Sequence, residues 1–326
     1  MKTIAFFNNK GGVGKTTLAY HLAHMLPRLG FPTLAVDLDP QANLTSAFMD
    51  EEELERLWDY PKEEAVTVLG CIEPILQGTG DIRMPELLIP SSFFGPWVLP
   101  GDLGLSRFED KLSDSWPKGY NNDPAALRAT SAFYRIIQGA GAEVHAKIAL
   151  VDVGPNLGAI NRSALLAADY IVVPLAADLF SLQGLRNLGP TIRDWRKQWQ
   201  RIKEGASVTF DLPSGQMSPA GYVVLQHAVR LDRPVRAYEK WLRRIPGEYR
   251  GAVLGEPEGD AEPDEHCLAT LRNYRSLMPM AQDARKPIFD LLAADGAIGS
   301  HAQLARTCGS EFRLLAQRIL ERCGLL

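Results

Sequence analysis

The chain has few cysteines, and they lie far apart. Its 326 residues include only four, and no two of them form a CxxC pair: Cys71, Cys267, Cys308 and Cys323. Structural zinc sites use closely spaced ligand pairs, and disulfide scaffolds are small and dense in cysteine. The sequence therefore favours reduced thiols over a zinc site or a disulfide framework, as expected for a cytoplasmic protein.

Long hydrophobic runs are also missing. No segment reaches the ~18 uncharged apolar residues that a transmembrane helix needs. The apolar stretch at residues 4–7 is followed at once by Asn8, Asn9 and Lys10, so it is too short for a signal-peptide core. Hydrophobic residues make up 46% and charged residues 23%, which is typical of a folded soluble domain.

The chain has no overall excess of basic charge, since its formal net charge is −4. The charge is nevertheless divided unevenly: residues 1–180 hold 14 basic and 22 acidic residues, whereas residues 181–326 hold 21 and 17. Most of the basic excess lies in residues 186–250, with 13 basic against 6 acidic residues. Such an asymmetry fits either solvated helix faces or a side that meets a polyanion.

Continuous apolar runs alternate with helical patterns along the chain. The runs expected to be strands are Thr3–Phe7, Thr33–Asp37, Trp97–Pro100, Lys147–Asp152, Tyr170–Leu175 and Gly221–Leu225. The stretches expected to be helices are Thr17–Leu29, Pro124–Gln138, Arg162–Ala167, Leu182–Lys203 and Glu311–Cys323. Continuous runs indicate strands that are covered on both faces. The pattern predicts an α/β fold with a doubly wound, mostly parallel sheet and helices on both faces.

We find no linker that would divide the chain, so residues 1–326 are expected to form a single domain. Two segments are exceptions to the alternating pattern. Residues 50–125 contain an expected insertion, which begins acidic and continues rich in proline. Residues 251–265 combine six acidic residues with glycine and proline, which is typical of an exposed loop.

A glycine-rich segment follows the first expected strand and precedes the first expected helix. It reads Asn9-Lys10-Gly11-Gly12-Val13-Gly14-Lys15-Thr16-Thr17. Backbone N–H groups of such a loop can surround phosphate oxygens, and the helix N-terminus adds partial positive charge. Lys15 is placed to reach the β- and γ-phosphates, Thr16 to ligate Mg²⁺, and Thr17 to support the α-phosphate or cap the helix. The segment departs from GxxxxGK[ST] because Asn9 stands at the first glycine position and Lys10 adds a second lysine.

With this loop, the sequence resembles the ParA/MinD family of deviant-Walker ATPases, which have P-loop NTPase topology. Further motifs extend the resemblance to roughly two thirds of the chain. These are Asp37-Leu38-Asp39-Pro40-Gln41-Ala42-Asn43, Asp152-Val153-Gly154-Pro155-Asn156-Leu157-Gly158, and the stretches 167–175, 180–185 and 271–288.

The resemblance implies an ATP-sandwich homodimer in which Lys10 reaches the partner's phosphates. It also implies that Asp39 orients the attacking water, so Lys10, Lys15 and Asp39 are the expected catalytic residues. Asp37 and Asp152 end expected strands, where ligands bind in α/β folds, and they are the expected Mg²⁺ ligands together with Thr16. The nucleotide-binding set is Lys10, Gly11, Gly12, Val13, Gly14, Lys15, Thr16, Thr17, Gln226, Pro279 and Met280.

Some of these positions depart from the family pattern. Gly154 and Asn156 replace a proline and a serine in the loop expected to sense the γ-phosphate. Gln226 stands where the family has an asparagine that reads adenine, and its amide can form the same paired hydrogen bonds. Pro279 and Met280 are expected either to pack on the base or to belong to the core.

The ParA branch binds DNA without sequence preference, through cations that contact phosphates. The candidates here are Arg193, Lys197, Arg243, Arg272 and Arg275. A partner protein that stimulates slow ATP hydrolysis is also implied, and the cargo would be a plasmid, a chromosome or another assembly. One alternative is a nucleotide-switched protein-binding module without DNA binding. Another is a MinD-like membrane-associated ATPase that uses the apolar face of the last helix.

Overall fold

Seven parallel strands form one sheet in the described part of the chain. The computed structural model describes residues 1–59, 61, 64–87, 95–225, 235–256, 264–274 and 276–326. The strands are β1 (Lys2–Phe6), β2 (Thr33–Asp37), β3 (Trp97–Leu99), β4 (Ile148–Asp152), β5 (Tyr170–Ala176), β6 (Ser218–Leu225) and β7 (Cys267–Leu271). Their order is β3-β2-β4-β1-β5-β6-β7, and every neighbouring pair is parallel. The predicted α/β fold is confirmed.

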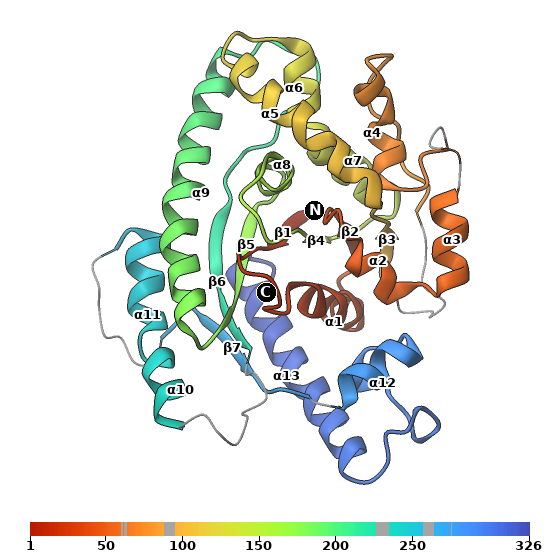
Figure 1. Cartoon of the computed structure of the whole chain (residues 1–326), viewed down its shortest axis with the longest axis vertical. Coiled ribbons are helices and arrows are strands. Elements are labelled where there is room, and N and C mark those ends of the chain that lie inside the picture. Colours follow the sequence, from red (N-terminus) through yellow and green to blue (C-terminus); the bar gives the residue numbers. More distant parts are fainter. Residues whose placement is uncertain (60, 62–63, 88–94, 226–234, 257–263, 275) are drawn as a thin grey trace.

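Two hydrophobic clusters lie on opposite faces of this sheet, because successive strand residues point to opposite sides. In β1, Ala5 belongs to one cluster, whereas Ile4 and Phe6 belong to the other. The first cluster packs under α4 (Val68–Gln77), α5 (Phe108–Gly119), α6 (Pro124–Thr130), α7 (Ala132–Glu143), α8 (Ala159–Leu166) and α9 (Leu179–Gly205). The second packs under α1 (Lys15–Arg28), α12 (Leu277–Ala284) and α13 (Ser300–Arg322) (Figure 1).

The remaining elements are short. They are α2 (Asn43–Phe48), α3 (Glu51–Asp59), α10 (Val235–Leu242), α11 (Ile245–Glu248) and a π-helical turn at Tyr249–Leu254. Three 3₁₀ turns complete the described elements: Leu103–Arg107, Ile288–Asp290 and Ala293–Asp295.

The six predicted strands all occur, but the seventh, β7, was not predicted. Only Leu268 and Leu271 of β7 are buried, because it lies at the edge of the sheet and has no continuous apolar run. The predicted helix Pro124–Gln138 is divided into α6 and α7 at Ser131. The predicted helix Glu311–Cys323 begins earlier in the structure, at Ser300. The prediction missed its first turns because they are mostly polar and only half-buried.

The segment predicted as an insertion supplies part of the sheet and of the core. Strand β3 pairs with β2, and Val68, Ile72 and Phe108 are fully buried in the first cluster. In the segment predicted as an acidic loop, residues 257–263 lie outside the described residues. The side chain of Asp264, just after these residues, is buried and accepts a hydrogen bond from the Tyr222 hydroxyl.

The apolar face of the last helix is occupied by the core. Phe312, Leu315, Ile319 and Cys323 are all buried in the second cluster. Within the described residues, we find no helix with the length and apolar character needed to span a bilayer.

Candidate functional site

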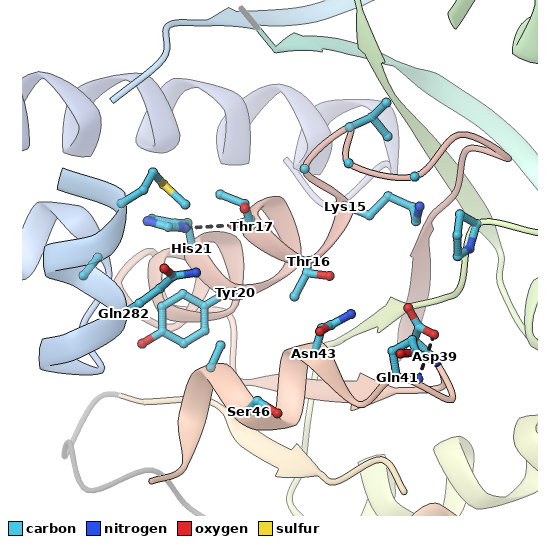
Figure 2. A pocket seen from close by; sticks show the side chains of 18 of the residues that line it. Lys15, Thr16, Thr17, Tyr20, His21, Asp39, Gln41, Asn43, Ser46 and Gln282 are labelled. Atoms are coloured by element: carbon cyan, nitrogen blue, oxygen red, sulfur yellow. Dashed lines mark hydrogen bonds between the residues drawn. The ribbon is translucent and has the colours of Figure 1, made fainter. Parts of the chain in front are cut away.

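The glycine-rich segment forms a loop between β1 and α1, at the carboxyl end of the sheet (Figure 2). Gly12 and Gly14 have φ angles of +70° and +77°, which side chains with a Cβ rarely adopt. A Cβ on Gly14 would also lie 2.8 Å from Cδ1 of Leu225. The backbone therefore needs glycine here, and the loop opens directly onto the N-terminus of α1.

Lys15 is buried beneath this loop. Its Nζ donates hydrogen bonds to the carbonyl oxygens of Asn8 and Lys10, each at 3.3 Å. Burial lowers the pKa of the ammonium, while the carboxylates of Asp152 and Asp39 oppose that shift. A cation held by long hydrogen bonds at a helix N-terminus is well suited to an incoming polyphosphate.

Thr16 and Asp152 meet at the end of β4. The Thr16 hydroxyl donates to Oδ2 of Asp152 at 2.6 Å, and Oδ1 of Asp152 is buried with no partner among the described residues. Burial, followed by the charge of Asp37, raises the pKa of Asp152 to about 8. An unsatisfied buried carboxylate oxygen beside a hydroxyl fits an oxygen-ligated Mg²⁺.

Asp37 is parallel-paired with Asp152 in the sheet, but its carboxylate makes other contacts. Its Oδ2 accepts hydrogen bonds from the Thr45 backbone at 2.8 Å and from the Thr45 hydroxyl at 2.7 Å. Its Oδ1 accepts one from the Asp39 backbone at 3.2 Å. Burial raises the pKa of Asp37 to about 6. Here Asp37 ties the end of β2 to α2, and its predicted role at the metal stays a prediction.

Asp39 lines the cavity next to the loop that follows β4. Its Oδ1 accepts a hydrogen bond from the Gln41 backbone at 3.0 Å. A Cβ on Gly154 would lie 3.2 Å from the same oxygen, so the glycine lets the loop approach Asp39 closely. Pro155 lines the cavity from that loop. The structure thus brings Asp39, Lys15 and the loop around one space.

Lys10, the second lysine, points away from Lys15 and contacts its own chain. Its Nζ pairs with the Asp178 carboxylate, which also caps α9 through the Ser181 backbone at 2.8 Å. Burial opposes the charge of Asp178, but the hydrogen bond from Lys10 holds its pKa below the usual value. Phe180 lies beside this pair with 73% of its surface exposed.

The cavity has a volume of about 730 Å³ and extends from the phosphate loop to α12. Its far end is lined by residues that the sequence did not single out: Tyr20, His21, Ser46, Ala47, Met278, Ala281, Gln282, Asp283 and Arg285 (Figure 2). The Tyr20 hydroxyl is buried with no partner among the described residues. The α1 helix pattern could have indicated Tyr20, because it follows Thr16 by four residues and so lies on the same helix face, but nothing local distinguishes it from a core residue.

The predicted base-contacting residues fare differently. Met278, and not Pro279 or Met280, lines the cavity; Pro279 is exposed, and Met280 packs against the second cluster and near Gly296. The helical turn of α12 decides which of these neighbours faces inward, and the sequence did not predict that helix. Gln226 lies outside the described residues.

The candidate DNA-contacting cations are dispersed, and several have protein partners. Arg193 donates to the backbone oxygens of Ala252 and Val253, at 2.6 and 3.1 Å. Arg272 pairs with Glu311 at 2.7 Å. Lys197 on α9 and Arg243 after α10 are exposed. Arg275 lies outside the described residues.

Comparison with known proteins finds relatives that are named as partitioning proteins. A family model described as an AAA domain matches residues 1–204. The chromosome partitioning protein ParA of Caulobacter vibrioides is 30% identical over 196 residues, which cover 59% of this chain and 62% of that protein. A probable plasmid-partitioning ParA of Thermus thermophilus is 29% identical over 271 residues, covering 83% of this chain and 70% of that protein.

The fold is shared over a greater length than the sequence similarity. A crystal structure of a Corynebacterium diphtheriae protein superposes with a TM-score of 0.72 at 25% identity, and 99% of each chain is covered. By contrast, the matched region spans less than two thirds of the Caulobacter relative's own length.

Proposed function

The chain belongs to the ParA/MinD family of ATPases, and from that premise we propose that it is an ATP-switched DNA-positioning protein. In this proposal, ATP with Mg²⁺ joins two copies into a sandwich dimer that binds DNA without sequence preference. Hydrolysis, stimulated by a partner protein, then releases the DNA. The cargo is a plasmid, a chromosome or another assembly.

One observation carries the proposal: the residue that follows the last loop lysine contacts a buried carboxylate, and one oxygen of that carboxylate has no partner among the described residues. Thr16 and Asp152 lie in contact, and Oδ1 of Asp152 is free of hydrogen bonds among the described residues. Thr16 and Asp152 would hold Mg²⁺, which when bound neutralises phosphate charge. Lys15 would bind the β- and γ-phosphates, and the Asp39 carboxylate would accept a hydrogen bond from the attacking water.

Lys10 would act only after a rearrangement. Its Nζ is engaged by Asp178 of the same chain. Reaching a second copy's phosphates requires that this pair opens, and a phosphate that carries several negative charges is a stronger partner for the ammonium than the single carboxylate of Asp178. Dimer formation and exchange of the Lys10 partner would then be one event.

The proposal is tested by sizing the protein with ADP, with ATP and with a slowly hydrolysed ATP analogue, each with and without random duplex DNA. We expect a monomer with ADP, a dimer with ATP or the analogue, and DNA binding that needs ATP and weakens steeply with salt. A chain that stays monomeric with the analogue refutes the sandwich dimer. An ATP dimer that ignores DNA at low salt refutes the DNA step.

That last outcome would favour a second candidate, a nucleotide-switched module that binds a protein and not DNA. It is supported by the engagement of two candidate cations: Arg193 bonds to backbone oxygens, and Arg272 pairs with Glu311. The carbonyl oxygens occupy an N–H donor group of Arg193, and the Glu311 carboxylate offsets the charge of Arg272, so each side chain offers less to a phosphate. Charge-reversal of exposed Lys197 separates the candidates, because only a DNA-binding dimer would lose affinity for duplex.

A further inference from the structure

The loop between β4 and α8 is held in place mainly from α8. Asn161 in the first turn of α8 donates through Nδ2 to the backbone oxygens of Gly154 and Asn156, at 2.8 and 2.6 Å. Oδ1 of Asn156 accepts a hydrogen bond from the Gly158 backbone at 2.9 Å. The position of this loop, and of Gly154 beside Asp39, therefore depends on where α8 begins.

The N-terminus of α8 is capped by a residue from another helix. Its own N-cap residue is Gly158, which has no side chain to cap with. Instead, Glu109 in the first turn of α5 accepts from the backbone of Ala159 through Oε1 at 2.6 Å and from Ile160 through Oε2 at 2.9 Å. A carboxylate at this end of a helix satisfies two orphan N–H groups and complements the helix dipole.

Gly158 is also what lets Glu109 approach. A Cβ at position 158 would lie 2.7 Å from Oε1 of Glu109. The φ angle of Gly158 is −78°, so its backbone conformation does not itself demand glycine. Space for the carboxylate is therefore the reason that the structure offers for a glycine here.

Further along, α5 and α8 are joined by a second contact. The Arg162 guanidinium lies 4.1 Å from the centre of the Trp116 ring, and Trp116 donates through Nε1 to Gln198 of α9 at 2.8 Å. Burial lowers the pKa of Arg162 to about 10, while the charge of Glu109 opposes that shift. Two contacts with α5 thus set the start and the rotation of α8.

We propose that Glu109 is a positioning residue for ATP hydrolysis, which acts by fixing the loop of residues 153–158 against Asp39. Glu109 does not touch the cavity; it acts through α8 and Asn161. This inference rests on the proposed ATPase function. An ordinary helix cap would stabilise the fold without affecting turnover selectively, so the two roles differ in what a mutation changes.

The test compares Glu109→Gln and Glu109→Ala with Asp110→Asn. Asp110 is exposed in the same first turn of α5, which makes its variant a control for lost negative charge. We expect Glu109→Ala to lower kcat about fivefold or more, with KM for ATP within about twofold. Glutamine has one acceptor oxygen, so Glu109→Gln should fall between wild type and alanine. Unchanged kcat in the folded Glu109 variants, or equal losses in kcat and affinity, overturns the proposal.

Amide hydrogen exchange gives a readout that does not need turnover. In the nucleotide-free protein, we expect Glu109→Gln to accelerate exchange at Gly154 and at residues 156–158, as well as at Ala159 and Ile160. Faster exchange at Ala159 and Ile160 alone indicates a plain cap and overturns the proposal. A wild type that does not hydrolyse ATP refutes the proposed function instead, and the exchange measurement still decides whether Glu109 positions the loop.

Discussion

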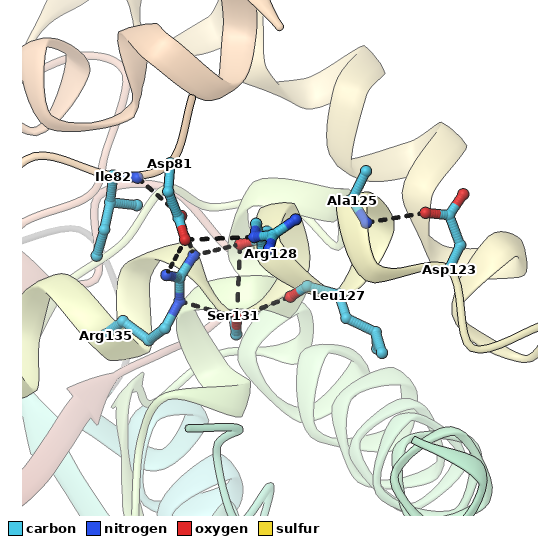
Figure 3. A network of polar contacts seen from close by, with 8 residues as sticks. All are labelled: Asp81, Ile82, Asp123, Ala125, Leu127, Arg128, Ser131 and Arg135. Atoms are coloured by element: carbon cyan, nitrogen blue, oxygen red, sulfur yellow. Dashed lines mark hydrogen bonds and ion pairs between the residues drawn. The ribbon is translucent and has the colours of Figure 1, made fainter. Parts of the chain in front are cut away.

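Two groups of charged side chains in this molecule differ in how fully their charged atoms are paired. Around Asp81, between α4 and β3, the Asp81 carboxylate and the Arg135 guanidinium have hydrogen-bond partners (Figure 3). Arg135 donates to both oxygens of Asp81, at 2.9 and 2.7 Å, and also to the Ser131 hydroxyl and the Arg128 backbone. At the phosphate loop, Asp152 keeps one oxygen unpaired and Lys15 has only long hydrogen bonds.

The pKa directions follow the same division. Burial opposes the charge of Asp81, but the hydrogen bond from Arg135 leaves its pKa below the usual value. Burial raises the pKa of Asp152 to about 8, because partners do not compensate. Charged groups with hydrogen-bond partners stabilise the fold, whereas buried charged groups without partners are available to a ligand. Five experiments test this difference between the two regions.

The largest expected effect comes from Lys15→Ala. Removing the buried ammonium should weaken ATP binding about a thousandfold, since charge-assisted hydrogen bonds to phosphate are strong. Calorimetric titration measures the loss, and Lys118→Ala, an exposed lysine paired with Asp114, is the control. Tight ATP binding by the Lys15 variant would contradict the assigned site.

Next is Asp39→Ala, which should lower ATP turnover about a hundredfold while ATP binding persists. The expected product is an ATP dimer that does not dissociate, because hydrolysis is the step that releases the dimer in the proposed function. Size-exclusion chromatography with ATP measures the trapped dimer against wild type. Rapid turnover by this variant would remove Asp39 from its proposed role.

A third variant, Arg135→Met, tests the paired charges around Asp81. It leaves Asp81 with the Ile82 backbone N–H at 2.8 Å and the more distant Arg128 at 3.4 Å, and it should lower the free energy of unfolding by about 2 kcal/mol. ATP affinity should not change. Denaturant titration and ATP titration together check this, and a large loss of affinity would mean that the two regions are coupled.

A fourth experiment uses pH. The folded chain holds protons on Asp37 and Asp152, with pKa values of about 6 and about 8, that the unfolded chain releases near pH 4. Stability of the nucleotide-free protein should therefore fall as pH rises through this window. Buried His21 and His24, with lowered pKa values, oppose this trend only below about pH 6.5.

Thermal unfolding between about pH 6.5 and about pH 8.5, with a chelator present, measures this decline. Asp152→Asn should flatten it, because the amide does not titrate. An equal decline in the variant would show that other groups are responsible.

The smallest expected effect is that of Tyr20→Phe. Removing an unpartnered buried hydroxyl should leave the nucleotide-free protein as stable as before or slightly more so. If the nucleoside occupies the far end of the cavity, ATP affinity should fall about threefold, the loss of one neutral hydrogen bond. Melting curves with and without ATP separate the two effects, and unchanged ATP stabilisation would place the nucleoside elsewhere.

Much of the fold could be predicted from local sequence patterns. The phosphate loop, five interior strands and one edge strand were predicted because each has a continuous signal in a few neighbouring residues. Strand β7 was not predicted, because this edge strand buries only Leu268 and Leu271 and therefore has no continuous apolar run. Helices α3, α4, α5 and α12 were not predicted, because their segments are acidic, contain proline or are short, and so show no clear helical spacing of apolar residues.

The candidate site was predicted in part for the same reason. Lys15 and Thr16 belong to one loop, so spacing alone placed them together. The contact of Thr16 with Asp152 joins residues 136 positions apart, and the resemblance and the place of Asp152 at the end of a strand pointed to it. Pro279 and Met280 were expected either to pack on the base or to belong to the core; Met280 packs against the second cluster, and Met278 lines the cavity, since the helix rotation is set by packing.

Six of the seven strands, the phosphate loop and the family resemblance could be predicted from the sequence, because they depend on runs and motifs of neighbouring residues. Only the tertiary structure decided how the charges are shared. It paired Lys10 with Asp178, turned Asp37 toward Thr45, left Asp152 with an unpaired oxygen and placed Glu109 of α5 at the N-terminus of α8. Hydrogen bonds act over a few ångströms in space, and which distant residues come that close is fixed by the packing of the whole domain.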